Sequence, residues 1–214
     1  SVQKGRAGVA VATACEVVAV RTGLQGLPTR RDMLTGRWVE ADVVFPGEAG
    51  PVTVVSAYVP TGELETDKQV AKYEFLGAMT ARLGQLMSRA QEPGGSQAVV
   101  SGDFNVAHHE ADIKNWKGNI GHRGFLEEER AYLTTWLEEQ GWADVVRDAA
   151  GPGPGPYTWW SWRGKAFDND AGWRIDYQLA TPGLAARVSG FEIGRAETYA
   201  ARWSDHAPVI VTYA

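Results

Sequence analysis

The chain has 214 residues, 44% of them hydrophobic, and a formal net charge of −5 at pH 7. These values predict one globular domain, residues 1–214, with a sizeable core, and no apolar run reaches the roughly 20 residues of a membrane-spanning helix. The acidic balance argues against nucleic-acid binding by overall charge, because phosphate binding usually shows a basic patch. Cys15 is the only cysteine, which excludes an internal disulfide and suits a reducing cytoplasm, and its apolar neighbours predict a core position.

Strands are predicted where short β-branched runs lie between breakers, and helices where apolar residues recur every three to four positions. One helix opens at the capping box 66–69, keeps Val70 on its apolar side and ends near Ala90, and another covers 127–140. This mixture predicts an α/β fold, in which the Gly-Pro tract 151–156 is too short to separate two domains. In chain order the predicted strands cover residues 8–14, 38–45, 52–59, 98–101, 157–160, 175–179 and 208–213.

Asp103 and Asn105 follow a predicted interior strand, and Gly102 before them lets the backbone turn. Alternate residues of an extended segment point the same way, so these two polar side chains can address one ligand. An Asx turn that merely closes a loop is the structural alternative, because Asp and Asn are common in such turns.

Three more predicted strands carry polar residues near one end. Tyr58 lies just before the Pro-Thr-Gly that terminates its strand, and Asp176 lies on a β-type segment. Asp205 and His206 directly precede the last strand, where they offer a charge partner or metal ligand and a proton-transfer group. Ligand sites of α/β proteins gather at strand ends, so we expect these side chains to meet.

Five motifs in this order resemble the exonuclease III family, which are metal-dependent AP endonucleases of the endonuclease/exonuclease/phosphatase superfamily. They are Tyr-Val-Pro, Gly-Asp-Phe-Asn-Val-Ala, Tyr-Thr-Trp-Trp-Ser, Gly-Trp-Arg-Ile-Asp-Tyr and Ser-Asp-His-Ala-Pro. The resemblance runs from about Gly5 to the end of the chain and includes residues 112–119. It implies a DNase I-like sandwich of two packed β-sheets flanked by helices, in four layers. It also implies hydrolysis of the phosphodiester 5′ to abasic sites in duplex DNA and trimming of 3′ ends.

The resemblance further implies a role for each catalytic residue. Asp103 would orient or deprotonate the attacking water, and Asn105 would hold that water or the phosphate. His206 would bind the scissile phosphate, with its ring fixed by Asp176. Tyr58 would donate to the phosphate or to the departing oxygen.

A divalent cation, Mg²⁺ or Mn²⁺, is implied in the same way, with Asp205 at its position and Asp103 and Asn105 beside it. The family's principal metal ligand is a Glu in a Gln-Glu-Thr strand that follows an Asn-containing strand and a helix. The first residues here already resemble the next strand, so we expect an N-terminally incomplete fold and site. The 214-residue chain alone should then be nearly inactive, unless Glu40 or Glu63 holds the metal.

DNA contacts are implied for two sets of residues, and we expect a monomer without a membrane partner. A base-free sugar leaves an apolar gap that aromatic rings could fill. The DNA-facing loop would contribute Asn115, Lys117 and Asn119, and the pocket for the abasic sugar would contribute Trp159, Trp173 and Ile175. Local positive charge is available from Arg30, Arg31 and Arg37 and from Lys114, Lys117, His122 and Arg123.

Two alternatives remain open at this point. A phosphoesterase of the same superfamily could act on an inositol phosphate or a phospholipid headgroup, although the loop 115–119 and the segment 172–176 resemble the DNA-directed branch. A chain without the metal-binding Glu could instead be a catalytically inactive DNA-binding fragment.

Overall fold

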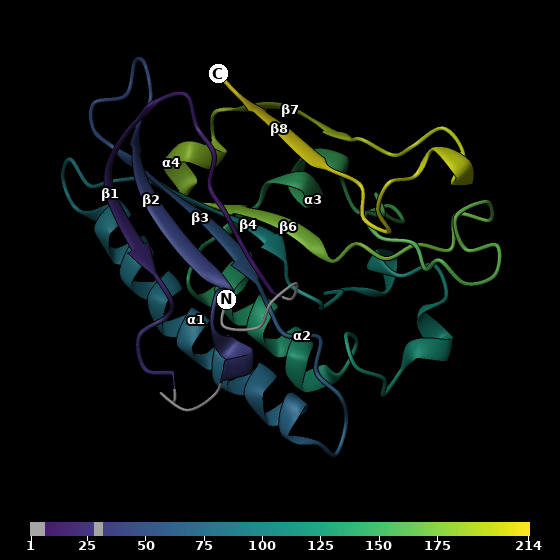
Figure 1. Ribbon diagram of the computed structural model, residues 1–214. Coiled ribbons are helices and arrows are strands. Elements are labelled where there is room, and N and C mark those ends of the chain that lie inside the picture. The colour runs from purple at the N-terminus through teal and green to yellow at the C-terminus, as the bar shows by residue number, and fades with distance from the viewer. Residues whose placement is uncertain (1–6, 28–31) are drawn as a thin grey trace.

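The computed structural model describes residues 7–27 and 32–214, and a six-stranded β-sheet runs through the centre of this part (Figure 1). Its strands β3 and β4 are parallel, and all other neighbours are antiparallel. In spatial order the strands are β1 (Glu16–Thr22), β2 (Trp38–Val44), β3 (Val52–Tyr58), β4 (Ala98–Asp103), β6 (Asp176–Ala180) and β5 (Ala143–Asp144). A second sheet pairs β7 (Val188–Ile193) with β8 (Val209–Tyr213).

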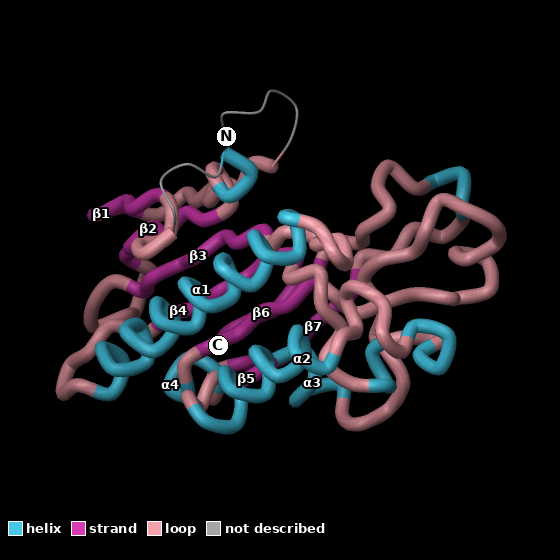
Figure 2. The backbone as a smooth tube through the Cα atoms, turned by 90° about the horizontal axis from the view of Figure 1, so that it is seen from below, coloured by secondary structure: helices cyan, strands magenta, loops and turns pink. Residues whose placement is uncertain are grey.

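Helix α1 (Asp67–Gln91) connects the parallel strands β3 and β4 and covers one face of the central sheet (Figure 2). Thr66 caps its N-terminus by accepting a hydrogen bond from the amide of Lys68. The other helices are α2 (Glu127–Thr134), α3 (Val145–Ala150) and α4 (Pro182–Ala185). In the described part of the chain, no helix combines the length and apolar character that a membrane span requires.

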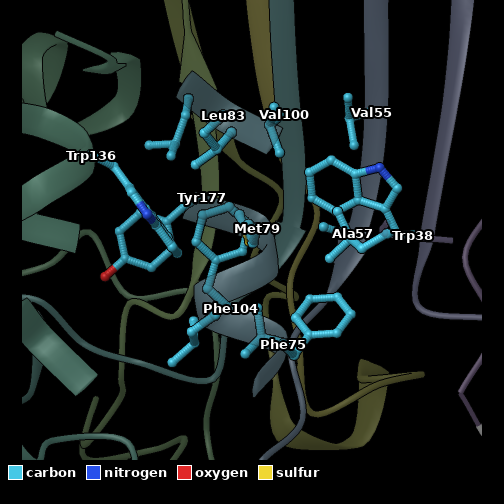
Figure 3. Packing of buried hydrophobic residues seen from close by; sticks show 14 of the residues in the cluster. Trp38, Val55, Ala57, Phe75, Met79, Leu83, Val100, Phe104, Trp136 and Tyr177 are labelled. Atoms are coloured by element: carbon cyan, nitrogen blue, oxygen red, sulfur yellow. The ribbon is translucent and has the colours of Figure 1, made fainter. Parts of the chain in front are cut away.

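The main core lies between the central sheet and α1 (Figure 3). Phe75, Met79 and Leu83 of α1 are fully buried there, at the three-to-four-residue spacing that places side chains on one helix face. Trp136, just after α2, meets the ring of Phe104 edge-on at 5.8 Å. These contacts fix the strand ends and the loops that follow them.

The opposite face of the central sheet packs on β7–β8. Val52 and Val99 of the central sheet form a second apolar cluster with Phe191, Val209 and Val211. The expected α/β fold, with two packed sheets and flanking helices, is thereby confirmed. The outer side of β8 stays in solvent, where Ile210 is 47% exposed.

Several sequence predictions need correction. Residues 8–14 form no strand, because the β-branched run 16–22 pairs with β2 in their place. Residues 157–160 contribute only a bridging residue, Trp159. The helix predicted over 127–140 changes to a wider π turn at Thr135–Glu139.

Two predicted core positions are also wrong. Cys15 is half-buried and lies outside the core clusters of the described residues. Val70 is 47% exposed, whereas its neighbours Gln69 and Lys72 are buried. The first turn of α1 thus directs polar side chains inward. Gly5, Arg30 and Arg31 lie outside the described residues.

Candidate active site

The central-sheet face that carries β7–β8 becomes polar toward the carboxyl ends of β3 and β4. Residues in register on adjacent strands project from the same side of a sheet, so each row across β3, β4 and β6 has one chemical character. From the interior outward, these rows are Val54, Val99 and Ala180, then Ser56, Ser101 and Gln178, then Tyr58, Asp103 and Asp176. The outermost row therefore brings together three residues that the sequence singled out. Because β6 is antiparallel to β4, Asp176 begins its strand.

Gly102 allows β4 to approach β3 closely just before Asp103. Its φ is +152°, and an added Cβ would lie 1.8 Å from the carbonyl oxygen of Ala57. Asn105 has a φ of +51°, and its amide donates to Asp103 Oδ1 at 2.8 Å. The Asx turn is therefore present, and it holds both side chains at the same cleft. Asn105 Nδ2 also donates to Asp103 Oδ2 at 3.0 Å.

His206 is held by Asp176. Its Nδ1 lies 2.9 Å from Asp176 Oδ2, and that oxygen also accepts from the hydroxyl of Thr158 at 2.6 Å. Nδ1 is the donor in this pair, which leaves Nε2 3.9 Å from Asp103 Oδ2. Thr158 was not identified as a site residue, although it stands in the Tyr-Thr-Trp-Trp motif.

Electrostatics couple these groups. Burial alone would lower the pKa of His206, but the hydrogen bond to Asp176 and the charges of Asp176, Asp103 and Asp205 raise it to about 9. Burial and then the charge of Asp176 raise the pKa of Asp103 to about 7, against the opposing effect of His206. A charged imidazolium therefore lies beside Asp103 and Asp176 at neutral pH.

A cleft of about 700 Å³ opens over these residues. Its acidic lining residues, within the described part of the chain, are Glu63, Asp103 and Asp205. Asp205 Oδ2 accepts from the indole of Trp159 at 3.0 Å. No three His, Cys, Asp or Glu side chains among the described residues converge closely enough to enclose a metal ion. Mg²⁺ usually keeps several waters and takes one or two carboxylates plus substrate phosphates, so this set of oxygen donors fits a hydrated hard cation.

The two alternative metal acids differ in position. Glu40 lies on β2, where it binds Arg21 and Arg82 and is 2% exposed. The suggestion that Glu40 holds the metal is therefore wrong. Glu63 does line the cleft, and it accepts a hydrogen bond from Lys68.

Tyr58 lines the cleft. The guanidinium of Arg37 lies over the ring of Tyr58, with Cζ 4.5 Å from the ring centroid. Arg37 also donates to the carbonyl oxygen of Tyr58 at 3.3 Å, and burial lowers the pKa of Arg37. Arg37 thus supports Tyr58 directly, a contact that the sequence did not indicate.

An apolar wall closes one side of the cleft. Trp159 and Trp173 meet edge-on with ring centroids 6.1 Å apart, and Ile175 is 6% exposed beside them. All three line the cleft, as expected for the pocket residues. Trp160 is buried in a separate cluster with Phe167, whereas Trp162 is 45% exposed.

The loop after Asp112 packs against this apolar wall and also contributes to the cleft. Asn119, His122 and Arg123 line the cleft, and Asn119 Nδ2 donates to the carbonyl of Asn115 at 2.9 Å. Asn115 and Lys117 belong to the same loop but do not line the cleft. Lys117 instead lies 5.5 Å from the ring centroid of Trp116.

Arg174 holds the start of this loop through hydrogen bonds to Asp112. Its fully buried guanidinium donates to Asp112 at 2.7 Å and to Asp144 at 2.7 Å. The neighbours of Arg174 in sequence, Trp173 and Ile175, are thereby fixed at the cleft wall.

Comparisons with known proteins are consistent with this arrangement. The model of the endonuclease/exonuclease/phosphatase family matches residues 1–206. An exodeoxyribonuclease of Bacillus subtilis (strain 168) is 30% identical over 209 residues, which cover 98% of this chain and 75% of that protein. The structure of the 3′ phosphatase NExo from Neisseria, bound to a product DNA hairpin, superimposes with a TM-score of 0.79 at 27% identity, over 94% of this chain and 72% of that one. An AP endonuclease from Archaeoglobus fulgidus gives a TM-score of 0.77 at 28% identity, over 93% and 72% of the respective chains.

Proposed function

Because the chain belongs to the endonuclease/exonuclease/phosphatase family, we propose that it is a DNA repair nuclease that hydrolyses the phosphodiester 5′ to abasic sites and trims 3′ ends of duplex DNA. The observation that carries this proposal is the Asp176–His206 pair, which faces Asp103 at 3.9 Å beside an aromatic pocket. We further propose that it acts as a monomer in the cytoplasm.

Hydrolysis of a phosphodiester needs a positioned water, compensation for charge on the phosphate and help for the leaving oxygen. Asp103 accepts the proton of the water or orients it, and Asn105, locked to Asp103 by two hydrogen bonds, holds the water or a phosphate oxygen. The pKa of Asp103, raised to about 7 by burial and by the charge of Asp176, is suited to a base that works near neutral pH.

His206 attracts the phosphate. Its pKa of about 9 keeps the ring charged at neutral pH, and Asp176 fixes its orientation through Nδ1. Nε2 is then free to donate to a phosphate oxygen in the cleft. Tyr58 reaches the same cleft from β3 and donates to the phosphate or to the leaving oxygen.

Asp205, Asp103 and Asn105 would hold a divalent cation, which we propose is Mg²⁺ or Mn²⁺. When bound, such a cation supplies Lewis-acid stabilisation of the phosphate oxygen. The hydrogen bond that the Trp159 indole donates fixes Oδ2 of Asp205 at the cleft.

Substrate choice rests on the cleft walls. Trp159, Trp173 and Ile175 offer an apolar space for a sugar without a base. Asn119 lines the same cleft and contacts the DNA backbone, with Asn115 and Lys117 on the same loop. The relatives are nucleases, so an inositol phosphate or phospholipid substrate is not favoured.

The test is single-turnover cleavage of a labelled duplex that carries one tetrahydrofuran abasic analogue, with protein in excess and Mg²⁺ present. We expect incision on the 5′ side of the analogue, loss of incision in His206→Ala, and no change in Asp168→Asn, a conservative change at an exposed acid. Excess protein makes slow cleavage measurable. A folded chain that leaves this duplex intact but dephosphorylates an inositol phosphate would contradict the proposal.

A further inference from the structure

A buried ion pair lies directly behind the candidate active site. Lys72 of α1 and Glu129 of α2 are both fully buried, with Nζ 2.8 Å from Oε1. Neither residue lines the cleft. Burying two charges is costly, and an apolar pair of similar size often serves stability equally well, so stability alone does not account for this pair.

The pair is bonded to the backbone of three separate loops. Lys72 Nζ donates to the carbonyl oxygen of Asn105 at 2.9 Å and to that of Thr61 at 3.3 Å. Glu129 Oε2 accepts from the amide of Gly124 at 2.6 Å. Each of these loops supplies side chains to the cleft, so one pair connects all three.

Two glycines next to the pair lie so close to neighbouring atoms that a larger side chain would be strained at either position. At Gly62, with a φ of +76°, an added Cβ would lie 2.4 Å from Gln69 Oε1 and 3.0 Å from Lys72 Cδ. At Gly124, with a φ of +83°, an added Cβ would lie 3.3 Å from the carbonyl oxygen of Asn105. The loop of Gly62 therefore approaches Lys72 as closely as glycine permits, and the loop of Gly124 approaches the carbonyl to which Lys72 donates in the same way.

Gln69 completes the arrangement. Its side-chain amide nitrogen, Nε2, donates to Glu129 Oε1 at 2.9 Å, so the side chain that the sequence assigned to a helix cap binds α2 instead. The first turns of α1 and α2 are thus joined at the point where the three loops converge. A shift of either helix start would move the backbone of Asn105 relative to Gly124.

We infer that Lys72 and Glu129 are positioning residues for the reaction: they set the Asn105 turn, which holds the water, against the loop that faces DNA. The inference rests on the proposed function for its kinetic consequence. Misplacement of reacting groups by about 1 Å can lower a rate by about 100-fold without loss of binding. Loss of the pair should therefore lower the cleavage rate more than the affinity for DNA.

The decisive variant is Lys72→Met with Glu129→Gln. It removes both charges, so no uncompensated ion stays buried, and Gln at position 129 can still accept from Gly124. The donors to Asn105 and Thr61 are lost. We expect a folded protein whose single-turnover rate on abasic duplex falls about tenfold or more, with Kd changed by no more than about threefold.

A matched control removes another ion pair of α1. Arg82→Met with Glu40→Gln neutralises a partly buried pair on the sheet, away from the cleft, and should change thermal stability but not the cleavage rate. Lys72→Arg with Glu129→Asp keeps both charges and the donors and should restore part of the rate. An equal loss of rate in both neutralised variants would overturn the inference.

Hydrogen exchange separates this inference from the proposed function. In the protein without DNA, the amides of Asn105 and Gly124 should exchange faster in the Lys72→Met/Glu129→Gln variant, by about tenfold, while β2 and β3 stay protected. This outcome would support the positioning role even if the wild type cleaved no DNA. Unchanged exchange at both amides in a folded variant would overturn it.

Discussion

Asp176→Asn should lower the pKa of His206 while leaving the fold intact. In the wild type, burial lowers the pKa of His206, but the hydrogen bond and charge of Asp176, together with the charges of Asp103 and Asp205, raise it from 6.5 to about 9. This net shift corresponds to about 3 kcal/mol in favour of the charged ring. Asn can still accept the Nδ1 hydrogen bond but carries no charge. Since Asp103 and Asp205 still contribute, we expect the pKa of His206 in the variant to fall clearly below its wild-type value.

The sign of the pH dependence follows from this raised pKa. A histidine whose pKa is higher in the folded than in the unfolded chain stabilises the fold fully below pH 6.5, and this contribution is lost as the pH rises through about 9. In Asp176→Asn most of the contribution is absent. The difference in free energy of unfolding between wild type and variant should therefore be larger at pH 6 than at pH 9.5.

Imidazole NMR between pH 5 and 10, with chelator present, measures the pKa directly. His108 provides an internal reference, because burial lowers its pKa to about 3 and its ring should stay neutral over this range. Asp168→Asn should leave the His206 titration unchanged. A wild-type His206 that titrates near 6.5, or a titration that Asp176→Asn does not move, would refute the reasoning.

Three further outcomes are expected. Asp103→Asn should slow single-turnover cleavage by about 1,000-fold but leave Kd for abasic duplex within about threefold, and near wild-type cleavage would remove Asp103 from the chemistry. Chelation should abolish cleavage and Mg²⁺ or Mn²⁺ should restore it, so activity that survives exhaustive chelation would exclude the metal requirement. Gly102→Ala should lower the free energy of unfolding, measured by urea titration, by about 3 kcal/mol or more, because the added Cβ meets the Ala57 carbonyl. Gly77→Ala on α1, where an added Cβ meets open space, should cause no such loss.

The sequence predicted the central strands well where a β-branched run is bounded by breakers, as in β2, β3 and β4. It also predicted that Asp103 and Asp176 would meet, because polar residues at strand ends collect at one edge. The roles assigned to these residues remain predictions. Strand pairing was harder to predict. The runs 8–14 and 16–22 are both compatible with a β-strand, and pairing with β2 decides which of them forms one.

The polar contacts between residues distant in the chain could not be predicted from the local sequence pattern. Gln69 fits a capping box with Thr66, yet its side chain binds Glu129, sixty residues later. Arg37 fits a basic surface cluster, yet its guanidinium packs over the ring of Tyr58. Such pairings depend on how helices and loops meet in space, which periodicity does not encode.

The register row of Tyr58, Asp103 and Asp176 also bears on how the protein acquires activity during folding. Each residue comes from a different strand, and His206 arrives only with the segment that leads into β8. Contacts between residues so distant in sequence form late and slowly, because the loops between them must close first. A refolding chain should therefore regain no cleavage in any early collapsed state, and recovery of activity should follow the slowest step of sheet assembly.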